Sequence, residues 1–337
     1  MQNYKKDNRS DKIQTVKTYY ITDLDQCEKL WKKLITPKHI SDLWEFRLCF
    51  HNHFQHKPFF FVLEDQKGIS GMIPMSHVEN IDTCFLFPGE MWNNKTWLER
   101  TPVYIRDGCS INKLLNTCPD NVYLRYLEVP YEKLPSGFSE DETGYVLYPG
   151  NMGFNIDEYF KRFSHKKIKA IHKVIHSYLD SGCEFFYDRV EDFDSLVEMS
   201  LQQFGNKSFL YDERFRNGFR DALDFLQKRK MLRITSVVID GELAATDIGA
   251  VFQGIYTVFM GGTDSRFPGI AKLMNMGHID YAFRERINKV DFLCGGFHWK
   301  LLWHLDPEIL YEYKTNPLSI ANIAGISHSS THMSAVK

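Results

Sequence analysis

Residues 255–296 read IYTVFMGGTDSRFPGIAKLMNMGHIDYAFRERINKVDFLCGG and carry the strongest indication of the architecture. The apolar run over 255–260 predicts a strand that ends at Gly261 and Gly262. After a loop, the apolar spacing predicts a helix over 269–286, and a second buried strand is expected over 290–293. A strand, a glycine turn, a helix and a strand in this order indicate an α/β fold.

The junction between the loop and the helix has a pattern that suits an anion. Residues 266–271 have the form R-x-x-G-x-A, with Arg266 first and Gly269 at the expected helix start. Glycine lets backbone N–H groups approach a ligand, and the first turn of a helix holds unpaired N–H donors at the positive end of its dipole. The motif therefore suits a pyrophosphate, although a structural turn explains it equally well.

The sequence before this segment predicts a hairpin and several helices. Asp240-Gly241 separates the apolar runs 232–239 and 243–251, which is typical of a β-hairpin. Helical periodicity covers 164–181, 192–204 and 212–230.

Part of this order recurs in the first half of the chain. A helix follows Ser41 and ends before Lys57-Pro58, and strands are expected over 59–63 and 69–75. Helix, strand, turn and strand thus occur at 41–75 as well as at 212–251. This indicates either a weak structural duplication or the chance recurrence of a common unit.

Loop-forming residues mark the expected organisation into lobes. Proline, glycine and acidic residues cluster over 133–153, which places a boundary near residue 150. We expect an N-terminal lobe over 14–150 and a C-terminal lobe over 151–320. The polar segment 1–13 is expected to be a flexible arm, and 321–337 a flexible tail.

Composition excludes several classes of protein. The 337 residues carry 41 basic and 43 acidic side chains, a net charge of −2, which weakens a nucleic-acid-binding hypothesis. No apolar run approaches the roughly 18 residues of a membrane helix. The seven cysteines are scattered and contain no C-x-x-C pair, which argues against a disulfide framework and a cysteine zinc site. A soluble cytoplasmic protein is expected.

The ordered series of segments resembles the GNAT-type N-acyltransferase superfamily. The resemblance is carried by the R-x-x-G-x-A motif, the 232–251 hairpin and the closing stretch DFLCGGFHWK at 291–300. The large-chain CelD/BcsL-like acetyltransferases are a closer resemblance, over roughly residues 40–304, and commonly fold as two GNAT-like halves. This implies two tandem lobes, each a mixed, mostly antiparallel sheet flanked by helices.

The resemblance also implies a co-substrate. In the superfamily this motif cradles the pyrophosphate of acyl-CoA, so acyl-CoA or acetyl-CoA is the expected donor. The residues expected to bind it are Gly262, Arg266, Gly269, Ile270, Ala271 and Lys272. No metal is expected, because the histidines over 51–56 lack a third ligand at metal spacing.

Candidate catalytic residues lie on the hairpin and the closing stretch. Asp247 is the preferred general base, because this sheet faces the acceptor amine in GNAT-type folds, although an exposed strand residue explains it as well. His298 and Lys300 are further catalytic candidates, with Asp291 and Trp299 as substrate contacts. Alternatively, Asp291 and Lys300 form a structural ion pair. Trp299 stands where the family more usually has tyrosine.

The sequence leaves three functions open. The first is transfer of an acyl group from acyl-CoA to an amine of a small molecule or peptide held between the lobes. The second resembles the Fem-type transferases, which use aminoacyl-tRNA; it is less favoured, because no long charged helical hairpin is seen. The third is binding without catalysis. The six Lys and Arg over 161–173 suit a solvated helix face, a coenzyme phosphate or tRNA.

Overall fold

The structure is a computed structural model that describes residues 16–93, 95–107, 109–128, 137–296 and 298–315. The expected flexible arm, 1–13, and flexible tail, 321–337, lie outside the described residues. The helices are α1 (Leu24–Leu34), α2 (Trp44–Phe54), α3 (Ile111–Leu115), α4 (Ile156–Phe160), α5 (His165–Asp180), α6 (Asp192–Phe204), α7 (Glu213–Lys228), α8 (Ile270–Arg284) and α9 (His298–Leu302).

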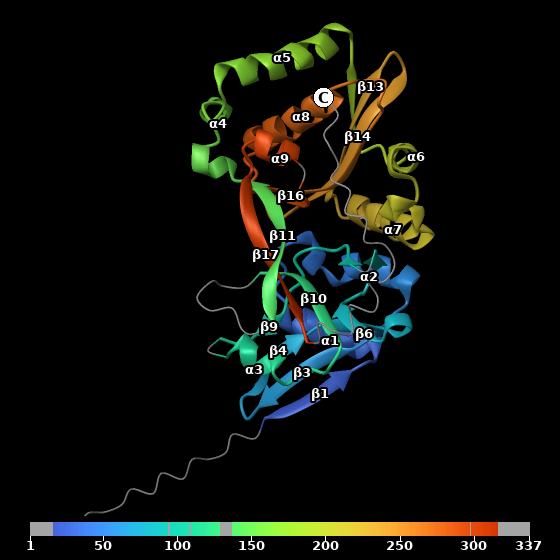
Figure 1. Cartoon of the computed structure of the whole chain (residues 1–337), viewed down its shortest axis with the longest axis vertical. Helices are drawn as coiled ribbons and strands as arrows, with labels where there is room; N and C mark the ends of the chain where they lie inside the picture. The colour runs from blue at the N-terminus through green and yellow to red at the C-terminus, as the bar shows by residue number, and fades with distance from the viewer. Residues whose placement is uncertain (1–15, 94, 108, 129–136, 297, 316–337) are drawn as a thin grey trace, which may run out of the picture.

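The strands fall into a large sheet, a smaller sheet and a short hairpin (Figure 1). The 11-stranded sheet has the order β12-β13-β14-β15-β16-β11-β17-β10-β6-β5-β2. Its strands are β2 (Lys57–Pro58), β5 (Met75–Val78), β6 (Thr83–Leu86), β10 (Val122–Leu127), β11 (Phe138–Leu147), β12 (Glu184–Tyr187), β13 (Leu232–Ile239), β14 (Glu242–Phe252), β15 (Ile255–Thr263), β16 (Lys289–Cys294) and β17 (Asp306–Lys314). The 4-stranded sheet contains β1 (Lys17–Ile21), β3 (Phe60–Asp65), β4 (Gly68–Ile73) and β9 (Tyr104–Ile105), and the hairpin contains β7 (Met91–Trp92) and β8 (Lys95–Thr96).

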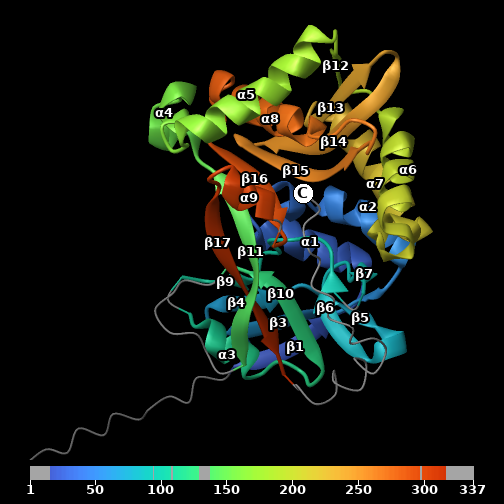
Figure 2. The same ribbon diagram turned by 45° about the horizontal axis from the view of Figure 1, so that its top comes forward.

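Most strand pairs are antiparallel, and the exceptions are β10 with β6 and β15 with β16. The second exception follows from the connection, because α8 carries the chain back between two parallel neighbours. Helices cover both faces of the sheet at this end, with α5 and α8 on one face and α6 and α7 on the other (Figure 2). This mixed α/β fold, a mostly antiparallel sheet flanked by helices, confirms the fold class expected from the sequence.

Helix α5 shows why the predicted elements form. Ser164 caps it by accepting the N–H of Lys167, and Ile171 and Ile175 bury one face against the core. The predicted bounds of α5, α6, α7 and the β13–β14 hairpin agree with the structure to within two residues at each end. Amphipathic periodicity is therefore the dominant signal in this half.

Two expected strand ends are wrong. The strand expected over 69–75 divides at Pro74, which has no N–H for a ladder; β4 remains in the small sheet and β5 joins the large one. Gly261 and Gly262 do not form a turn, because β15 continues to Thr263. A Cβ on Gly261 would stand 2.0 Å from Oδ1 of Asp247, so this glycine makes room for the carboxylate of the neighbouring strand.

Strands β11 and β17 connect the two halves of the large sheet. β11 pairs with β16 on one side and with β17 on the other, and β17 also pairs with β10. A buried arginine lies at this junction: Arg100 forms ion pairs with Asp291, Glu308 and Glu128 at 2.7, 2.7 and 2.6 Å. The sheet is thus continuous across residue 150, and the expected lobe boundary there stays a prediction.

Candidate active site

A cleft of ≈ 790 Å³ opens where β15 and β16 separate. These strands pair only over Ile255–Thr257 and Lys289–Asp291, and beyond these residues the two strands diverge. A bulge at Phe259 accompanies the separation, because Ile248 pairs with Met260 while Gly249 pairs with Val258. The cleft is lined from α8, from α6 and from the N-terminal half, so it passes through the gap from one face of the sheet to the other.

The N-terminus of α8 forms one end of the cleft. Gly269 has φ 86°, a left-handed conformation that favours glycine, and it lines the cleft with Ala271 and Lys272. Two N–H groups of the first turn already have acceptors: Ile270 donates to the Phe267 carbonyl at 3.2 Å, and Lys272 donates to the Gly269 carbonyl at 2.9 Å. An anion here would share these donors and meet the Lys272 side chain.

The other residues expected to bind the coenzyme lie off the cleft lining. Gly262 faces α6, where a Cβ would meet Met199 at 3.3 Å. Arg266 is exposed and bound to Asp264 at 2.6 Å, and Ile270 is buried in the core. The structure therefore brings Gly269, Ala271 and Lys272 together with Gly261 rather than with Gly262.

Asp247 is part of a buried hydrogen-bonded chain. Its Oδ2 lies 2.7 Å from Nε2 of His278 on α8, and Nδ1 of His278 lies 2.9 Å from the hydroxyl of Tyr256. The His278 side chain is 1% exposed, whereas that of Asp247 is 14% exposed and lines the cleft. Burial raises the pKa of Tyr256, so it remains a neutral hydroxyl. The chain holds the Asp247 carboxylate on the face of the sheet that α8 covers.

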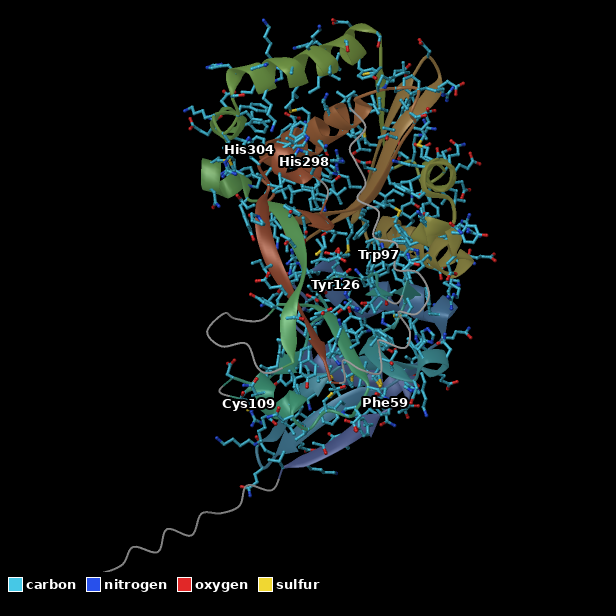
Figure 3. All side chains as sticks on the ribbon, in the orientation of Figure 1. Phe59, Trp97, Cys109, Tyr126, His298 and His304 are labelled. Atoms are coloured by element: carbon cyan, nitrogen blue, oxygen red, sulfur yellow. The ribbon has the colours of Figure 1, made fainter. Side chains whose placement is uncertain are left out.

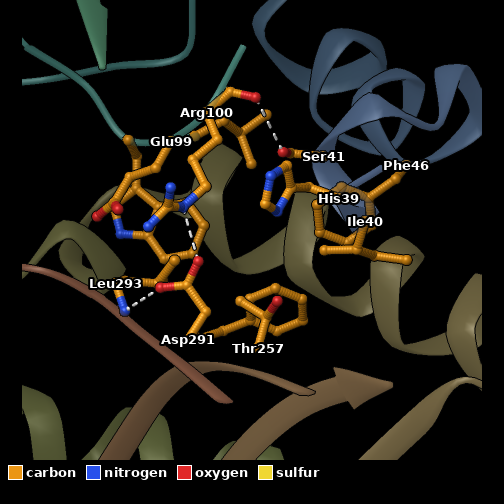
Figure 4. A pocket seen from close by; sticks show the side chains of 12 residues that line it. His39, Ile40, Ser41, Phe46, Glu99, Arg100, Thr257, Asp291 and Leu293 are labelled. Atoms are coloured by element: carbon orange, nitrogen blue, oxygen red, sulfur yellow. Dashed lines mark hydrogen bonds and ion pairs between the residues drawn. The ribbon is translucent and has the colours of Figure 1, made fainter. Parts of the chain in front are cut away.

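Asp291 is buried, and both of its carboxylate oxygens have partners within the protein. Its Oδ1 accepts the N–H of Leu293 at 3.0 Å, and its Oδ2 lies 2.7 Å from Nε of Arg100 (Figure 4). It lines a small separate cavity together with His39 and Glu99. The partner of Asp291 is thus Arg100, and its expected contact with substrate stays a prediction.

Lys300 and Trp299 shape the end of β16. Nζ of Lys300 donates to the carbonyls of Phe292, Leu293 and Cys294 at 2.9, 2.9 and 2.7 Å, and burial lowers the pKa of this lysine. Trp299 packs edge-on against Phe292, and both Lys300 and Trp299 line the cleft. A lysine with three carbonyl acceptors is well placed to hold the strand end in position. The catalytic role expected of it stays a prediction.

His298 begins α9 and is exposed, outside the residues that line the cleft (Figure 3). Its expected catalytic role also stays a prediction.

Sequence reasoning missed Glu99, a carboxylate from the N-terminal half. Both of its oxygens lie within hydrogen-bonding distance of the Cys294 N–H, at 2.8 and 2.9 Å, and it lines the cleft. Burial and the nearby Asp291 raise its pKa to about 7. Nothing in the local sequence pointed to Glu99, because its partner lies 195 residues away. His278 was missed because a lone histidine in a predicted helix resembles an ordinary core residue.

Aromatic side chains surround the other end of the cleft. Trp97 and Trp92 pack against Phe209 with ring centroids 5.4 and 6.2 Å apart. Tyr126 also lines the cleft, and the guanidinium carbon of Arg125 lies 4.2 Å from the centroid of its ring. The cleft thus has a helix N-terminus at one end and an aromatic wall at the other.

The described residues contain no cluster of three His, Cys, Asp or Glu side chains placed to hold a metal ion. Nor does any helix among them have the length and apolar character needed to cross a membrane.

Comparison with known proteins agrees with this geometry. Residues 165–301 match the family described as acetyltransferase (GNAT) domain. No curated protein matches the sequence. The solved structure of FemX gives a TM-score of 0.56 at 10% identity and covers 91% of this chain and 99% of that chain. The structure of L-PGS from Bacillus licheniformis gives a TM-score of 0.54 at 13% identity, and the match covers 90% of this chain and 95% of that chain. A tandem GNAT protein from the clavulanic acid biosynthesis pathway gives a TM-score of 0.50 at 9% identity, and the match covers 90% of this chain and 99% of that chain.

The separated strands, the helix that starts between them and the family match together define a GNAT-type domain in the C-terminal half. The superfamily resemblance seen in the sequence is therefore confirmed. At identities of 9–13% the solved structures show a shared fold alone, and that fold is tandem GNAT-like. The closer resemblance to the CelD/BcsL-like branch stays a prediction.

Proposed function

We propose that this protein transfers an acyl group from acyl-CoA to an amine that enters the cleft from its aromatic end. The observation that carries the proposal is the continuous cleft through the β15–β16 separation. It joins a helix N-terminus, which suits phosphate groups, to a chamber walled by both halves. A thioester that reached the separation from the α8 side would meet an amine arriving from the α6 side.

The donor end supports a phosphate-bearing coenzyme. Gly269, Ala271 and Lys272 line the cleft at the positive end of the α8 dipole, where an anion is stabilised. Exposed lysines on α5 lie beside this end, because Gly269 packs near Val174 and the Tyr178 hydroxyl donates to the Pro268 carbonyl at 3.0 Å. We propose that the pyrophosphate binds at α8 and that α5 meets the outer phosphate.

The reaction needs no covalent enzyme intermediate. The neutral amine attacks the thioester carbonyl carbon, a C–N bond forms, and the C–S bond breaks to release the CoA thiolate. Asp247, the general-base candidate from the sequence, is proposed as a proton-handling group, because His278 holds its Oδ2, its Oδ1 lies beside Gly261 and the residue lines the cleft.

The rival function, transfer from aminoacyl-tRNA, is supported by one observation. Lys166, Lys169 and Lys173 are exposed on α5 at a spacing that brings them to one side of the helix. A row of lysines attracts either an RNA backbone or the phosphates of a coenzyme. The size of the ligand therefore separates the two functions.

Calorimetry on the full chain tests the proposal. We expect CoA and acetyl-CoA to bind with 1:1 stoichiometry, and deacylated and aminoacylated tRNA to bind weakly and with strong salt dependence. A library of primary amines with acetyl-CoA, followed by release of free thiol, then identifies the acceptor. Tight aminoacyl-tRNA binding without CoA binding would support the rival function. Coenzyme binding without thiol release for any amine would indicate a binding protein.

A further inference from the structure

Glu99 occupies the gap that the separating strands leave. β16 loses its partner β15 after Asp291, and the N–H of Cys294, at the end of β16, is taken by the Glu99 carboxylate instead. The segment that carries Glu99 belongs to the α6–α7 side of the sheet, because Leu98 packs in one core with Ile248 and Met260. The carboxylate therefore reaches the separation from the face opposite to α8.

The charged and titratable groups around Glu99 come from several elements. Asp291 and Cys294 belong to β16, Arg100 adjoins Glu99 in the chain, Lys300 belongs to α9, and Tyr126 belongs to β10. Arg100 is engaged by Asp291, Glu308 and Glu128, and Lys300 donates to three backbone carbonyls. Both cations therefore have other partners close by, and the Glu99 side chain lines the cleft.

We infer that Glu99 is the general base that deprotonates the acceptor amine, which approaches along the wall formed by Trp92, Trp97 and Phe209. The inference rests on the proposed function and adds that the N-terminal half supplies a catalytic group. Asp247 lies across the sheet, on the side of α8, and so faces the coenzyme rather than the incoming amine.

The two carboxylates, Glu99 and Asp247, handle different protons of the acceptor amine. The acceptor arrives as an ammonium, R–NH₃⁺, and gives one proton to the Glu99 carboxylate, which passes it to solvent. The neutral nitrogen attacks the thioester carbon, and the C–S bond breaks with its electron pair on sulfur. The nitrogen loses a second proton as the amide forms, and the CoA thiolate takes up one. Asp247, held by His278, is on the correct face to relay that second proton.

A pKa of about 7 suits this role. A base whose pKa lies near the working pH combines a sizeable ionised fraction with enough basicity to take a proton from an ammonium. Because Glu99 must be ionised to act, kcat/KM is expected to rise with pH through about 7.

The test compares Glu99→Gln with Glu90→Gln. Glutamine keeps an oxygen that accepts the Cys294 N–H but cannot act as a base. Glu90 is a matched control: it is buried, accepts the N–H groups of Trp97 and Leu98 at 3.0 and 2.6 Å, has a pKa raised to about 7 by burial, and does not line the cleft. Each variant is assayed with acetyl-CoA and the amine of the library that reacts fastest with the wild-type protein.

We expect Glu99→Gln to lower kcat by about 10²–10⁴-fold with unchanged acetyl-CoA affinity, and to abolish the rise in rate near neutral pH. Methoxyamine, which is uncharged at neutral pH, should restore much of the rate, because it needs no initial deprotonation. Glu90→Gln should keep the wild-type pH profile. A folded Glu99→Gln protein with the wild-type rate and profile overturns the inference and leaves the proposed function intact. Failure of the wild-type chain to bind acetyl-CoA or cleave it overturns both.

Discussion

The two ends of the cleft are built in opposite ways. The coenzyme end comes from one continuous segment, in which β15, α8 and β16 follow each other within residues 255–294. The acceptor end is assembled from three separate segments of the chain, which meet only in the folded protein. One holds Trp92 and Glu99, the second Tyr126 and the third Phe209. Local order determines the first end and long-range pairing the second, so the two ends should respond to different substitutions.

The largest expected effect is on the long-range junction. Replacing Arg100 by methionine leaves the buried carboxylate of Asp291 without its cation, and removal of one member of a buried pair costs about 3–5 kcal/mol of unfolding free energy. Urea unfolding measures this loss. Acetyl-CoA affinity, measured by calorimetry on the protein that remains folded, should be nearly unchanged. A loss of stability below about 1 kcal/mol would contradict the importance of this junction.

The second-largest expected effect is on turnover, and it comes from substituting Asp247, which lies between the two ends of the cleft. Asp247→Asn removes the charge beside Gly261 while an amide oxygen can still accept a hydrogen bond from His278. We expect turnover to fall by about 10²-fold and the dissociation constant of acetyl-CoA to stay the same. Steady-state kinetics and calorimetry on one preparation measure both. Full turnover in this variant would remove Asp247 from the mechanism.

The smallest effect is confined to the coenzyme end. Gly269→Asp places a carboxylate where we expect a diphosphate and forces a side chain into a backbone with φ 86°. We expect acetyl-CoA affinity to fall about tenfold, an energy of about 1.4 kcal/mol. Gly182→Asp is the control, because Gly182 has φ 77° with no atom within 4 Å of an added Cβ. Equal affinities in the two variants would count against the predicted phosphate site.

The difference between the ends also explains which features could be predicted from the sequence. Hydrophobic periodicity and the Asp240-Gly241 turn are local signals, and they located α5, α6, α7, α8 and the β13–β14 hairpin. The R-x-x-G-x-A motif is likewise local, and it identified the start of α8 at Gly269. The superfamily followed from the order of these signals.

What could not be predicted depends on contacts between distant residues. The pairing of Arg100 with Asp291, and of Glu99 with Cys294, joins positions almost two hundred residues apart, and no short pattern records it. Gly261 and Gly262 were expected in a turn because glycine commonly ends strands. In the structure, Gly261 lies opposite Asp247 on the neighbouring strand, and a Cβ at this position would clash with the Asp247 carboxylate. This steric requirement depends on the register of the two strands, which the sequence does not show.

The position of β17 has a consequence for how the chain is made. Residues 306–314 lie between β11 and β10 in the sheet, and they are translated long after both of these strands. Until then both neighbours present unpaired edges, which attract other strands and favour aggregation. Because β17 pairs with both of them, the large sheet cannot be completed before residues 306–314 have been translated.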